Sequence, residues 1–331
     1  VLIELCRRCV GVPILCVLGA LLIYTFYNQL SYNPSLYQAL KNIVYKLFYT
    51  TNGVIGTPVN VCYTYIVLFI IFGAFLERTG IANFFIALAN RLAGWSAGGP
   101  AKVAVISSAL CGMVSGSSVG NTVTTGSVTI PMMKKTGYHP DFAGAVEAAA
   151  STGGQIMPPI MGAAAFLMAE YMDLPYATVA VKAILPAVLY FTGIFISVHL
   201  EAKKLGLQGL SKDEMPKWSF LLQKIYLLAP LVLLVWLVSS GAKTMQFSAA
   251  VSILAAVIVG FLNKDERLTF KKIFEALEAG AKGAITVGVA CAIAGMIAGC
   301  ITVTGLASIL INAIVQLAGS ATFIGLILTM V

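Results

Sequence analysis

A run rich in glycine and hydroxyl side chains interrupts an apolar part of this chain and reads Gly112-Met-Val-Ser-Gly-Ser-Ser-Val-Gly-Asn-Thr-Val-Thr-Thr-Gly126. The surrounding apolar region has Lys102 near its start and ends at Lys134 and Lys135. Basic residues that flank membrane segments stay on the cytoplasmic side, so both ends of this region are predicted to lie there. We therefore expect a re-entrant hairpin. Its tip should be non-helical and should be buried in protein or line a water-filled cavity.

The composition of the whole chain excludes an ordinary water-soluble protein. Of 331 residues, 59% are hydrophobic and 10% are charged, whereas soluble domains carry about 25% charged residues. Several apolar runs are long enough to cross a hydrocarbon core of roughly 30 Å as helices. They are Val10–Tyr24, Val61–Leu76, Tyr226–Ser239, Ser248–Leu262 and Ala284–Thr302. These runs lack the alternation of barrel strands, so we predict an all-α polytopic membrane protein in contact with lipid.

The net charge of +8 comes mainly from basic residues between the apolar runs, which argues against a nucleic-acid partner. Segments 201–224 and 263–282 each carry five basic residues and are predicted to be cytoplasmic. Arg7 and Arg8 place the start of the chain on the same side. Residues 28–57 then form an external loop.

Two segments of the chain repeat each other. Thr79–Gly94 aligns without a gap on Thr304–Gly319, and seven of the sixteen positions are identical. The helix before the first copy is predicted to run inward and the helix before the second outward, so the copies are inverted, as in many secondary transporters. At the same offset a second hairpin would begin after Val331, so we expect the chain to be part of a longer protein.

The repeat divides the chain into three predicted parts. Residues 1–57 form a linking membrane helix and the external loop. Residues 58–224 form the first repeat, with the hairpin and a broken helix. Residues 225–331 supply scaffold helices and the start of the second repeat.

The predicted hairpin tip offers many oxygen atoms from Ser115, Ser117, Ser118, Asn121, Thr122, Thr124 and Thr125. Hydroxyls and unwound carbonyls suit a small hard cation, and helix N-termini attract anionic groups. We expect substrate contacts from Ser117, Ser118, Asn121, Thr122 and Thr125. A helix-packing surface is the alternative, because Gly112, Gly116 and Gly120 form small-residue motifs. Packing explains the glycines but not the seven polar side chains.

The second candidate element reads Ser151-Thr-Gly-Gly-Gln-Ile-Met-Pro-Pro-Ile-Met161. Pro158 and Pro159 lack amide hydrogens, so a helix through them kinks or opens. An opened helix would free carbonyls near Gly154 to Met157 for an ion, and Gln155 could reach a substrate carboxylate. A structural proline kink is the alternative.

Two acidic residues, Glu147 and Glu170, lie in apolar surroundings. A carboxyl group within a membrane is a candidate for proton coupling or for a salt bridge. Glu147 could instead be solvated or paired with Lys134 or Lys135.

One feature typical of an enzyme is Gly116-Ser-Ser-Val-Gly120, which matches the G-x-S-x-G motif of hydrolases. That motif needs a strand–turn–helix context, whereas this one is flanked by predicted membrane helices. His139 and His199 are predicted at cytoplasmic ends, far from the tip. An intramembrane serine hydrolase is therefore a remote alternative, and we expect no enzyme. The lone Cys6-x-x-Cys9 pair is interpreted as structural.

Residues 112–138 and 143–162 resemble the fused permease of TRAP transporters, in the TAXI-associated branch. The similarity extends through Arg7-Arg8 and His199-Leu-Glu-Ala-Lys-Lys-Leu-Gly206. It implies an inner-membrane permease that receives an organic anion, typically a carboxylate, from a periplasmic binding protein. An ion gradient drives uptake, and the hairpins and broken helices move as an elevator against a scaffold. The sodium ligands implied by position are Ser115, Ser118, Asn121, Gly154, Met157 and Pro159.

The expected function is import of an organic acid with sodium as the coupling ion and no other cofactor. The hydroxyl-rich tip favours sodium, and Glu147 leaves proton coupling open. The alternative is an ion-coupled carboxylate transporter that works without a binding protein.

Overall fold

The computed structural model describes residues 1–32, 35–210, 215–241, 243–318 and 322–330. Gly319, the last residue of the second repeat copy, lies outside these ranges. The chain forms two compact units. The first consists of Val1–Tyr63 and Ile285–Val331, and the second of Thr64–Ala284. This division follows packing, whereas the predicted division at residues 57 and 224 follows the repeat and stays a prediction.

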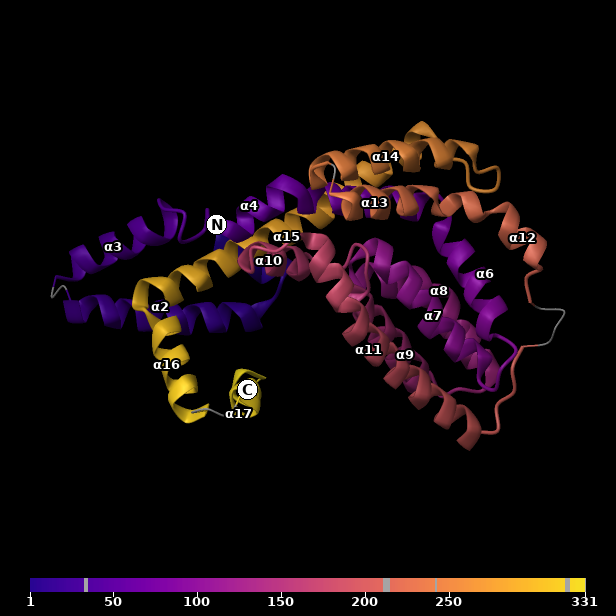
Figure 1. Ribbon diagram of the computed structural model, residues 1–331, viewed down its shortest axis with the longest axis horizontal. Helices are drawn as coiled ribbons and strands as arrows, with labels where there is room; N and C mark the ends of the chain where they lie inside the picture. Colours follow the sequence, from indigo (N-terminus) through magenta and orange to yellow (C-terminus); the bar gives the residue numbers. More distant parts are fainter. Residues whose placement is uncertain (33–34, 211–214, 242, 319–321, 331) are drawn as a thin grey trace. The chain divides into compact units, whose positions relative to one another are not determined.

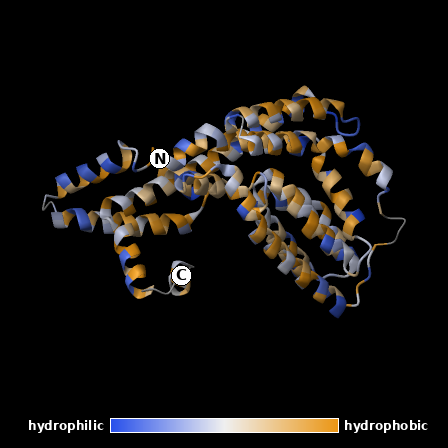
Figure 2. Cartoon of the chain, in the orientation of Figure 1, coloured by the Kyte–Doolittle hydropathy of each residue, from blue (hydrophilic) through white to orange (hydrophobic). Residues whose placement is uncertain are grey.

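The regular elements of the described residues are helical. Five helical segments within these residues are long and apolar enough to cross a membrane. They are α2 (Val12–Tyr32), the run Thr57–Arg78, α11 (Tyr176–Lys204), α14 (Met245–Leu262) and α15 (Phe270–Thr304). Figure 2 shows hydrophobic residues along most helices and a hydrophilic loop after α14. The prediction of an all-helical polytopic membrane protein is confirmed.

The first unit packs α1 (Leu2–Cys9), α2 and α3 (Leu36–Phe48) with the second part of α15. Cys6 is buried in one of its clusters, with Leu18 and Ile293. Glycines of α15 let the chain before α4 (Thr57–Val61) approach closely. A Cβ at Gly299 would lie 2.2 Å from the carbonyl oxygen of Asn52. The unit ends with α16 (Leu306–Ala318) and α17 (Thr322–Met330).

The prediction that residues 28–57 form a loop is wrong, because most of this segment is helical. The helix α2 continues to Tyr32, and α3 occupies residues 36–48. Ala39, Ile43 and Leu47 recur every four residues and are buried on one face of α3. This periodicity stabilises a helix against the apolar side chains of α2, which outweighs the polar composition of the segment.

The second unit holds a bundle of α6 (Ile81–Ala93), α7 (Gly99–Ser115), α8 (Ser118–Thr136), α9 (Pro140–Gly153) and α11. Figure 1 shows α7, α8 and α9 side by side, with α11 along them. Small residues such as Ala101, Ala143 and Ala150 are fully buried in the bundle core. Small side chains allow close helix contact within a membrane, where packing rather than the hydrophobic effect holds helices together.

Elsewhere in the second unit, α14 packs against α5 (Val67–Arg78), which follows a π-helical turn at Cys62–Ile66. The helix α13 (Ala229–Ser240) packs against α14, and α12 (Trp218–Gln223) contacts α6. A 3-10 turn at Ile225–Leu228 lies between α12 and α13. The side-chain amide of Asn263 donates to the carbonyl of Thr79 at 2.8 Å, and Arg78 forms an ion pair of 2.7 Å with Glu275. These contacts fix the turn between α5 and α6.

Both copies of the repeat have the same local structure. Gly80 has φ of +82° and Gly305 has φ of +68°, and each precedes a helix of 13 residues, α6 or α16. Thr79 and Thr304, one residue earlier, each bond a carbonyl three residues back. The positive φ explains the glycine of the shared Thr-Gly pair, because other residues rarely adopt that conformation.

Candidate functional site

The predicted hairpin is formed by α7 and α8, and its non-helical tip is only two residues long. α7 ends at Ser115, Gly116 turns with φ of +61°, and α8 begins at Ser118. Ser117 caps α8 by accepting a hydrogen bond of 3.2 Å from the amide of Gly120. The chain thus reverses in a tight turn that leaves the N-terminus of a 19-residue helix at the tip.

The predicted helix break lies between α9 and α10 (Ala163–Tyr171). After Gly153 the chain forms one 3-10 turn, Gly154–Ile156, and becomes extended at Met157. The amide of Gly162 bonds the carbonyl of Gln155 at 2.7 Å, which closes the connecting loop. The opened helix is therefore observed, rather than a kink in a continuous helix.

The hairpin formed by α7 and α8 contacts the helix break at glycine residues. A Cβ on Gly112 would lie 2.4 Å from the Cα of Gly154, and a Cβ on Gly116 would lie 2.4 Å from the carbonyl oxygen of Met161. Such distances are too short for any side chain. The packing interpretation of these two glycines is thus confirmed, and the same close packing brings the tip against the break. The site interpretation stays a prediction.

A polar contact joins the two elements at the same place. The amide nitrogen of Gln155 donates to the hydroxyl oxygen of Ser118 at 3.1 Å. Gln155 and Ser117 are exposed. The tip and the break therefore form one surface with both donors and acceptors.

Asn121, one of the predicted ligands, is buried, with 1% of its surface exposed. Its Nδ2 donates to the carbonyl of Ser108 at 2.8 Å, which orients the amide. Its Oδ1 is buried and has no hydrogen-bond partner. A buried acceptor without a donor is costly, and a cation would satisfy it.

Other predicted ligands already make hydrogen bonds within the protein. Thr122 and Thr124 donate to the carbonyls of Ser118 and Gly120, four residues back. The carbonyl of Gly154 accepts from Met157, and that of Pro159 accepts from Tyr176 at 2.8 Å. The two threonines use their hydroxyl hydrogens, and each of the two carbonyl oxygens accepts from a donor in the protein. All four groups keep an oxygen lone pair, which is what a cation needs.

Glu147 is fully buried at the interface of α7, α8 and α9. Its Oε1 accepts hydrogen bonds from Ser108 at 2.7 Å, Thr125 at 2.5 Å and Ser151 at 3.1 Å. Its Oε2 accepts from Thr129 at 2.5 Å. The alternative of a solvated Glu147, or one paired with Lys134 or Lys135, is wrong, because four hydroxyls enclose its carboxyl group.

This network contains residues that the sequence analysis missed. Ser108, Thr129 and Ser151 were not singled out. A signal was present, since Thr125 and Thr129, and likewise Glu147 and Ser151, are four residues apart and share a helix face. The network also holds Thr125 inside the bundle, in contact with Glu147 rather than at the tip. Glu170 differs from Glu147, since it is exposed and accepts a hydrogen bond of 3.3 Å from Tyr65.

The geometry does not support a hydrolase. The partner of Ser118 is the amide of Gln155, which cannot act as a general base. His139 caps α9, and His199 lies near the end of α11. Among the described residues there is no group of three or more His, Cys, Asp or Glu side chains that could hold a metal ion.

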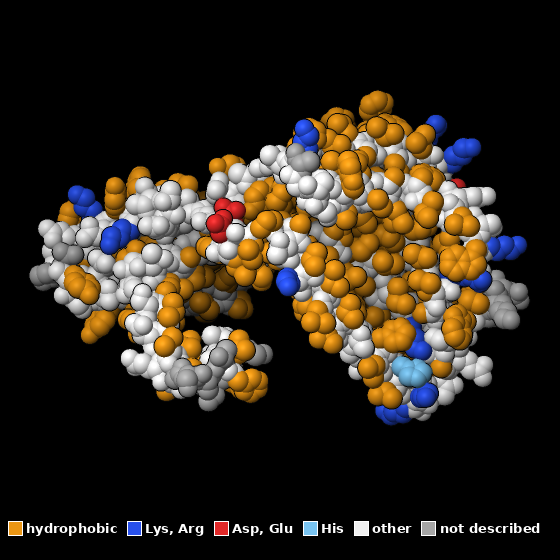
Figure 3. Space-filling view, in the orientation of Figure 1, with side chains coloured by type: hydrophobic (Ala, Val, Ile, Leu, Met, Phe, Trp, Pro, Cys, Tyr) orange, Lys and Arg blue, Asp and Glu red, His pale blue; other side chains and the backbone are white. Residues whose placement is uncertain are grey.

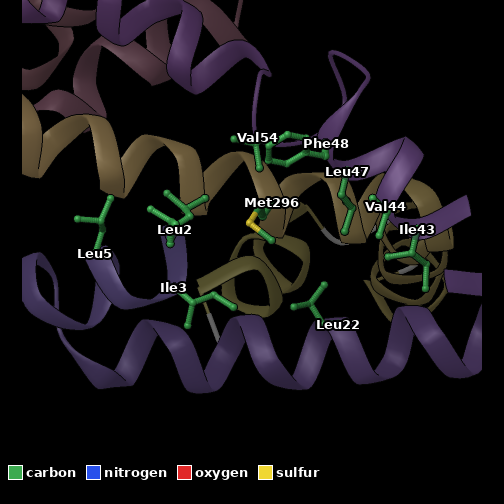
Figure 4. Close-up of a pocket in the computed structure, with 11 residues that line it drawn as sticks. Leu2, Ile3, Leu5, Leu22, Ile43, Val44, Leu47, Phe48, Val54 and Met296 are labelled. Carbon is green, nitrogen blue, oxygen red and sulfur yellow. The ribbon is translucent and has the colours of Figure 1, made fainter. Parts of the chain in front are cut away.

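A pocket of about 690 Å³ in the first unit is apolar (Figure 4). Leu2, Leu22, Leu47 and Met296 are among the side chains that line it. A site for a small anion needs a few convergent polar groups. This pocket lacks them, so the tip and the break stay the candidate site.

A family model described as "Tripartite ATP-independent periplasmic transporter, DctM component" matches residues 1–331. The chain belongs to this family. DctM chains are multi-pass proteins of the inner membrane and are transporter components rather than enzymes, which confirms those predictions. The finer assignment to the fused, TAXI-associated branch stays a prediction.

Several curated DctM relatives are similar to this chain. It is 26% identical over 203 residues to the C4-dicarboxylate TRAP transporter large permease protein DctM of Pseudomonas aeruginosa, covering 61% of this chain and 47% of the relative. It is 26% identical to the sialic acid permease protein SiaM of Vibrio cholerae, covering 58% and 45%. It is 23% identical to the 2,3-diketo-L-gulonate permease protein YiaN of Escherichia coli, covering 65% and 50%. The chain thus spans about half the length of these relatives.

Proposed function

We propose that the protein containing this DctM chain imports an organic acid, with the hairpin tip and the helix break forming one side of the transport site. The observation that carries this proposal is the junction of the two elements. There Gln155 bonds Ser118, and Gly112 meets Gly154 without room for a side chain. Two interrupted helices that meet at one place create exposed backbone ends, which transporters use to bind ions and substrates.

The chemistry of the junction favours a carboxylate substrate. The N-terminus of α8 points amide groups at the tip, and helix N-termini attract anions. The Gln155 amide and the Ser117 hydroxyl add donors beside it. The names of the three relatives denote a C4-dicarboxylate, sialic acid and 2,3-diketo-L-gulonate, which are all organic acids.

Sodium is the proposed coupling ion. The candidate ligands are the side chains of Ser115, Ser118 and Asn121 and the carbonyls of Gly154, Met157 and Pro159. The unpartnered, buried Oδ1 of Asn121 supports this set, because hard cations bind oxygen atoms. Glu147 is enclosed by hydroxyl groups away from the tip, which makes it a weaker candidate for carrying a coupled proton.

Movement of the site as one body is also part of the proposal. The tip, the break and the helices α7, α8 and α9 are joined by Glu147, by Gln155 and by the close glycine contacts. A unit joined in this way can move rigidly, as an elevator mechanism requires. A periplasmic binding protein would deliver the substrate to it.

The proposal is tested with the full-length permease and its binding protein in proteoliposomes. Uptake of a labelled organic acid should require an inward sodium gradient and the binding protein. Uptake that persists after collapse of the sodium and proton gradients would overturn ion coupling. Equal uptake with and without the binding protein would favour the alternative, a carboxylate transporter that acts alone.

A further inference from the structure

Lys102 is a buried lysine that has no acidic partner among the residues the structure describes. It lies in the first turn of α7, and only 4% of its surface is exposed. Its ammonium group donates to the hydroxyl of Ser96 at 3.0 Å and lies 5.3 Å from the centre of the Phe195 ring. None of the ion pairs found among the described residues includes it. A buried charge without a counter-charge is unfavourable, so this position is suited to an anion from outside the chain.

His199 and Lys203 of α11 are two further basic side chains near Lys102. Lys102 and Lys203 interact electrostatically with each other and with His199. The Nδ1 of His199 is shielded from solvent and has no hydrogen-bond partner. The nearby acid, Glu201, pairs with Lys204 at 3.4 Å and also acts on Tyr138. Counting the described side chains alone, positive charge is therefore in excess at this place. Figure 3 shows basic side chains gathered at the lower right, at this end of the bundle.

An apolar groove of about 340 Å³ continues from this basic group along α7 and α11. Its lining includes Val105 and Ile106, one turn after Lys102, and Phe195, one turn before His199. Phe195 belongs to both features, because the ammonium of Lys102 lies over its ring. The groove reaches Met157, the first extended residue of the helix break.

The residues around Lys102 are of the types found at a membrane–water interface. Trp95 is 68% exposed and precedes Ser96, the partner of Lys102. Tryptophan is enriched at the membrane–water interface, and basic residues mark the cytoplasmic side. We therefore expect the basic group at headgroup level, with the groove extending toward the acyl chains.

We propose that the groove between α7 and α11 binds one anionic phospholipid, with its phosphate at Lys102, His199 and Lys203 and an acyl chain against Val105 and Phe195. Basic pockets between membrane helices on the cytoplasmic side bind such headgroups. A soluble anion would leave the groove unfilled, and a zwitterionic lipid would bring a further positive charge beside the basic group. The proposal goes beyond the transport function and does not depend on the substrate. The acyl chain would also contact Met157, so the lipid would support the helix break.

Native mass spectrometry of the full-length permease tests this proposal. The protein is delipidated in detergent and given equal amounts of phosphatidylglycerol or phosphatidylcholine. Phosphatidylglycerol should bind at least about tenfold more tightly than phosphatidylcholine, a difference of about 1.4 kcal/mol. The variant K102Q should lose most of this preference. K135Q is the matched control, since Lys135 is an exposed lysine at the same end of the hairpin. Equal binding of the two lipids, or equal loss in both variants, would overturn the proposal.

A second variant tests the groove without touching the charge. T192W places an indole in the groove, whose exposed residue Thr192 contributes to the lining, and should also reduce binding of phosphatidylglycerol. Inorganic phosphate at millimolar concentration should not displace the lipid. Unchanged binding by T192W, or full displacement by phosphate, would show a soluble-anion site and overturn the proposal. Without lipid, K102Q should unfold at no lower temperature than the parent, because it removes an unpaired buried charge.

Discussion

The hydroxyl of Ser108 lies 2.7 Å from Oε1 of Glu147 and joins α7 to α9 across 39 positions of the chain. Thr125 and Thr129 bring α8 to the same carboxyl group. One buried acid therefore holds the two arms of the hairpin and the first half of the broken helix together. The arrangement of tip and break rests on this contact, which lies away from the tip itself.

Replacement of Glu147 should destabilise the bundle. E147A removes the shared acceptor of four hydroxyls and leaves a cavity, at a cost of roughly 3 kcal/mol or a fall in Tm of about 6–10 °C. Thermal unfolding of the purified protein in detergent measures this. The matched control is E170A, whose carboxyl group is exposed and should change Tm little. A small effect of E147A, equal to that of E170A, would contradict the assigned role.

The contact between Gly112 and Gly154 should not tolerate a methyl group. In G112A the new Cβ would meet the backbone of Gly154 at 2.4 Å, so the hairpin and the break would have to separate. We expect loss of most transport and a lower Tm. G144A is the control, because a Cβ there meets nothing within 4 Å. It should be neutral or stabilise α9 by up to about 1 kcal/mol. Normal transport by G112A would show that the two elements need not touch.

Gln155 and Ser118 should act as a pair in transport. Both Q155A and S118A should lower kcat/KM about tenfold, with little effect on Tm because Gln155 is exposed. The double variant should lose less than the sum, with a coupling energy of about 1 kcal/mol. T152A is the control, since Thr152 is exposed and bonds only its own helix. Transport by Q155A and S118A at the parent rate would contradict a role for this pair.

Asn121 should determine the response to sodium. Removal of its buried Oδ1 in N121A should raise the sodium concentration for half-maximal effect about tenfold, equal to about 1.4 kcal/mol. Stabilisation of the purified protein by sodium chloride, relative to choline chloride, measures this without transport. N90A is a matched control, because Asn90 on α6 also has a buried, unpartnered Oδ1 but lies outside the tip. Equal sodium stabilisation in N121A and the parent would exclude Asn121 as a ligand.

The sequence by itself determined the membrane class, the hairpin and the break, for local physical reasons. Apolar length forces a helix to cross the bilayer. Lysines at both ends of residues 101–134 keep a hairpin on one side, and Pro158 and Pro159 cannot continue a helix. Each of these constraints acts through residues close together in the chain. The same holds for Thr79-Gly80 and Thr304-Gly305, whose shared sequence gives the same turn in both copies.

Only the tertiary structure decided which polar groups meet. Ser108 carries no local signal as a partner of Glu147, because this contact depends on the packing of α7 against α9. Helix packing also decides that Thr125 lies inside the bundle and that Oδ1 of Asn121 has no donor. It likewise brings Lys102 into contact with α11. The helix α3 was missed for a related reason, since its buried face is stabilised by α2. Burial and pairing of polar groups are set by distant neighbours, and a linear pattern does not contain them.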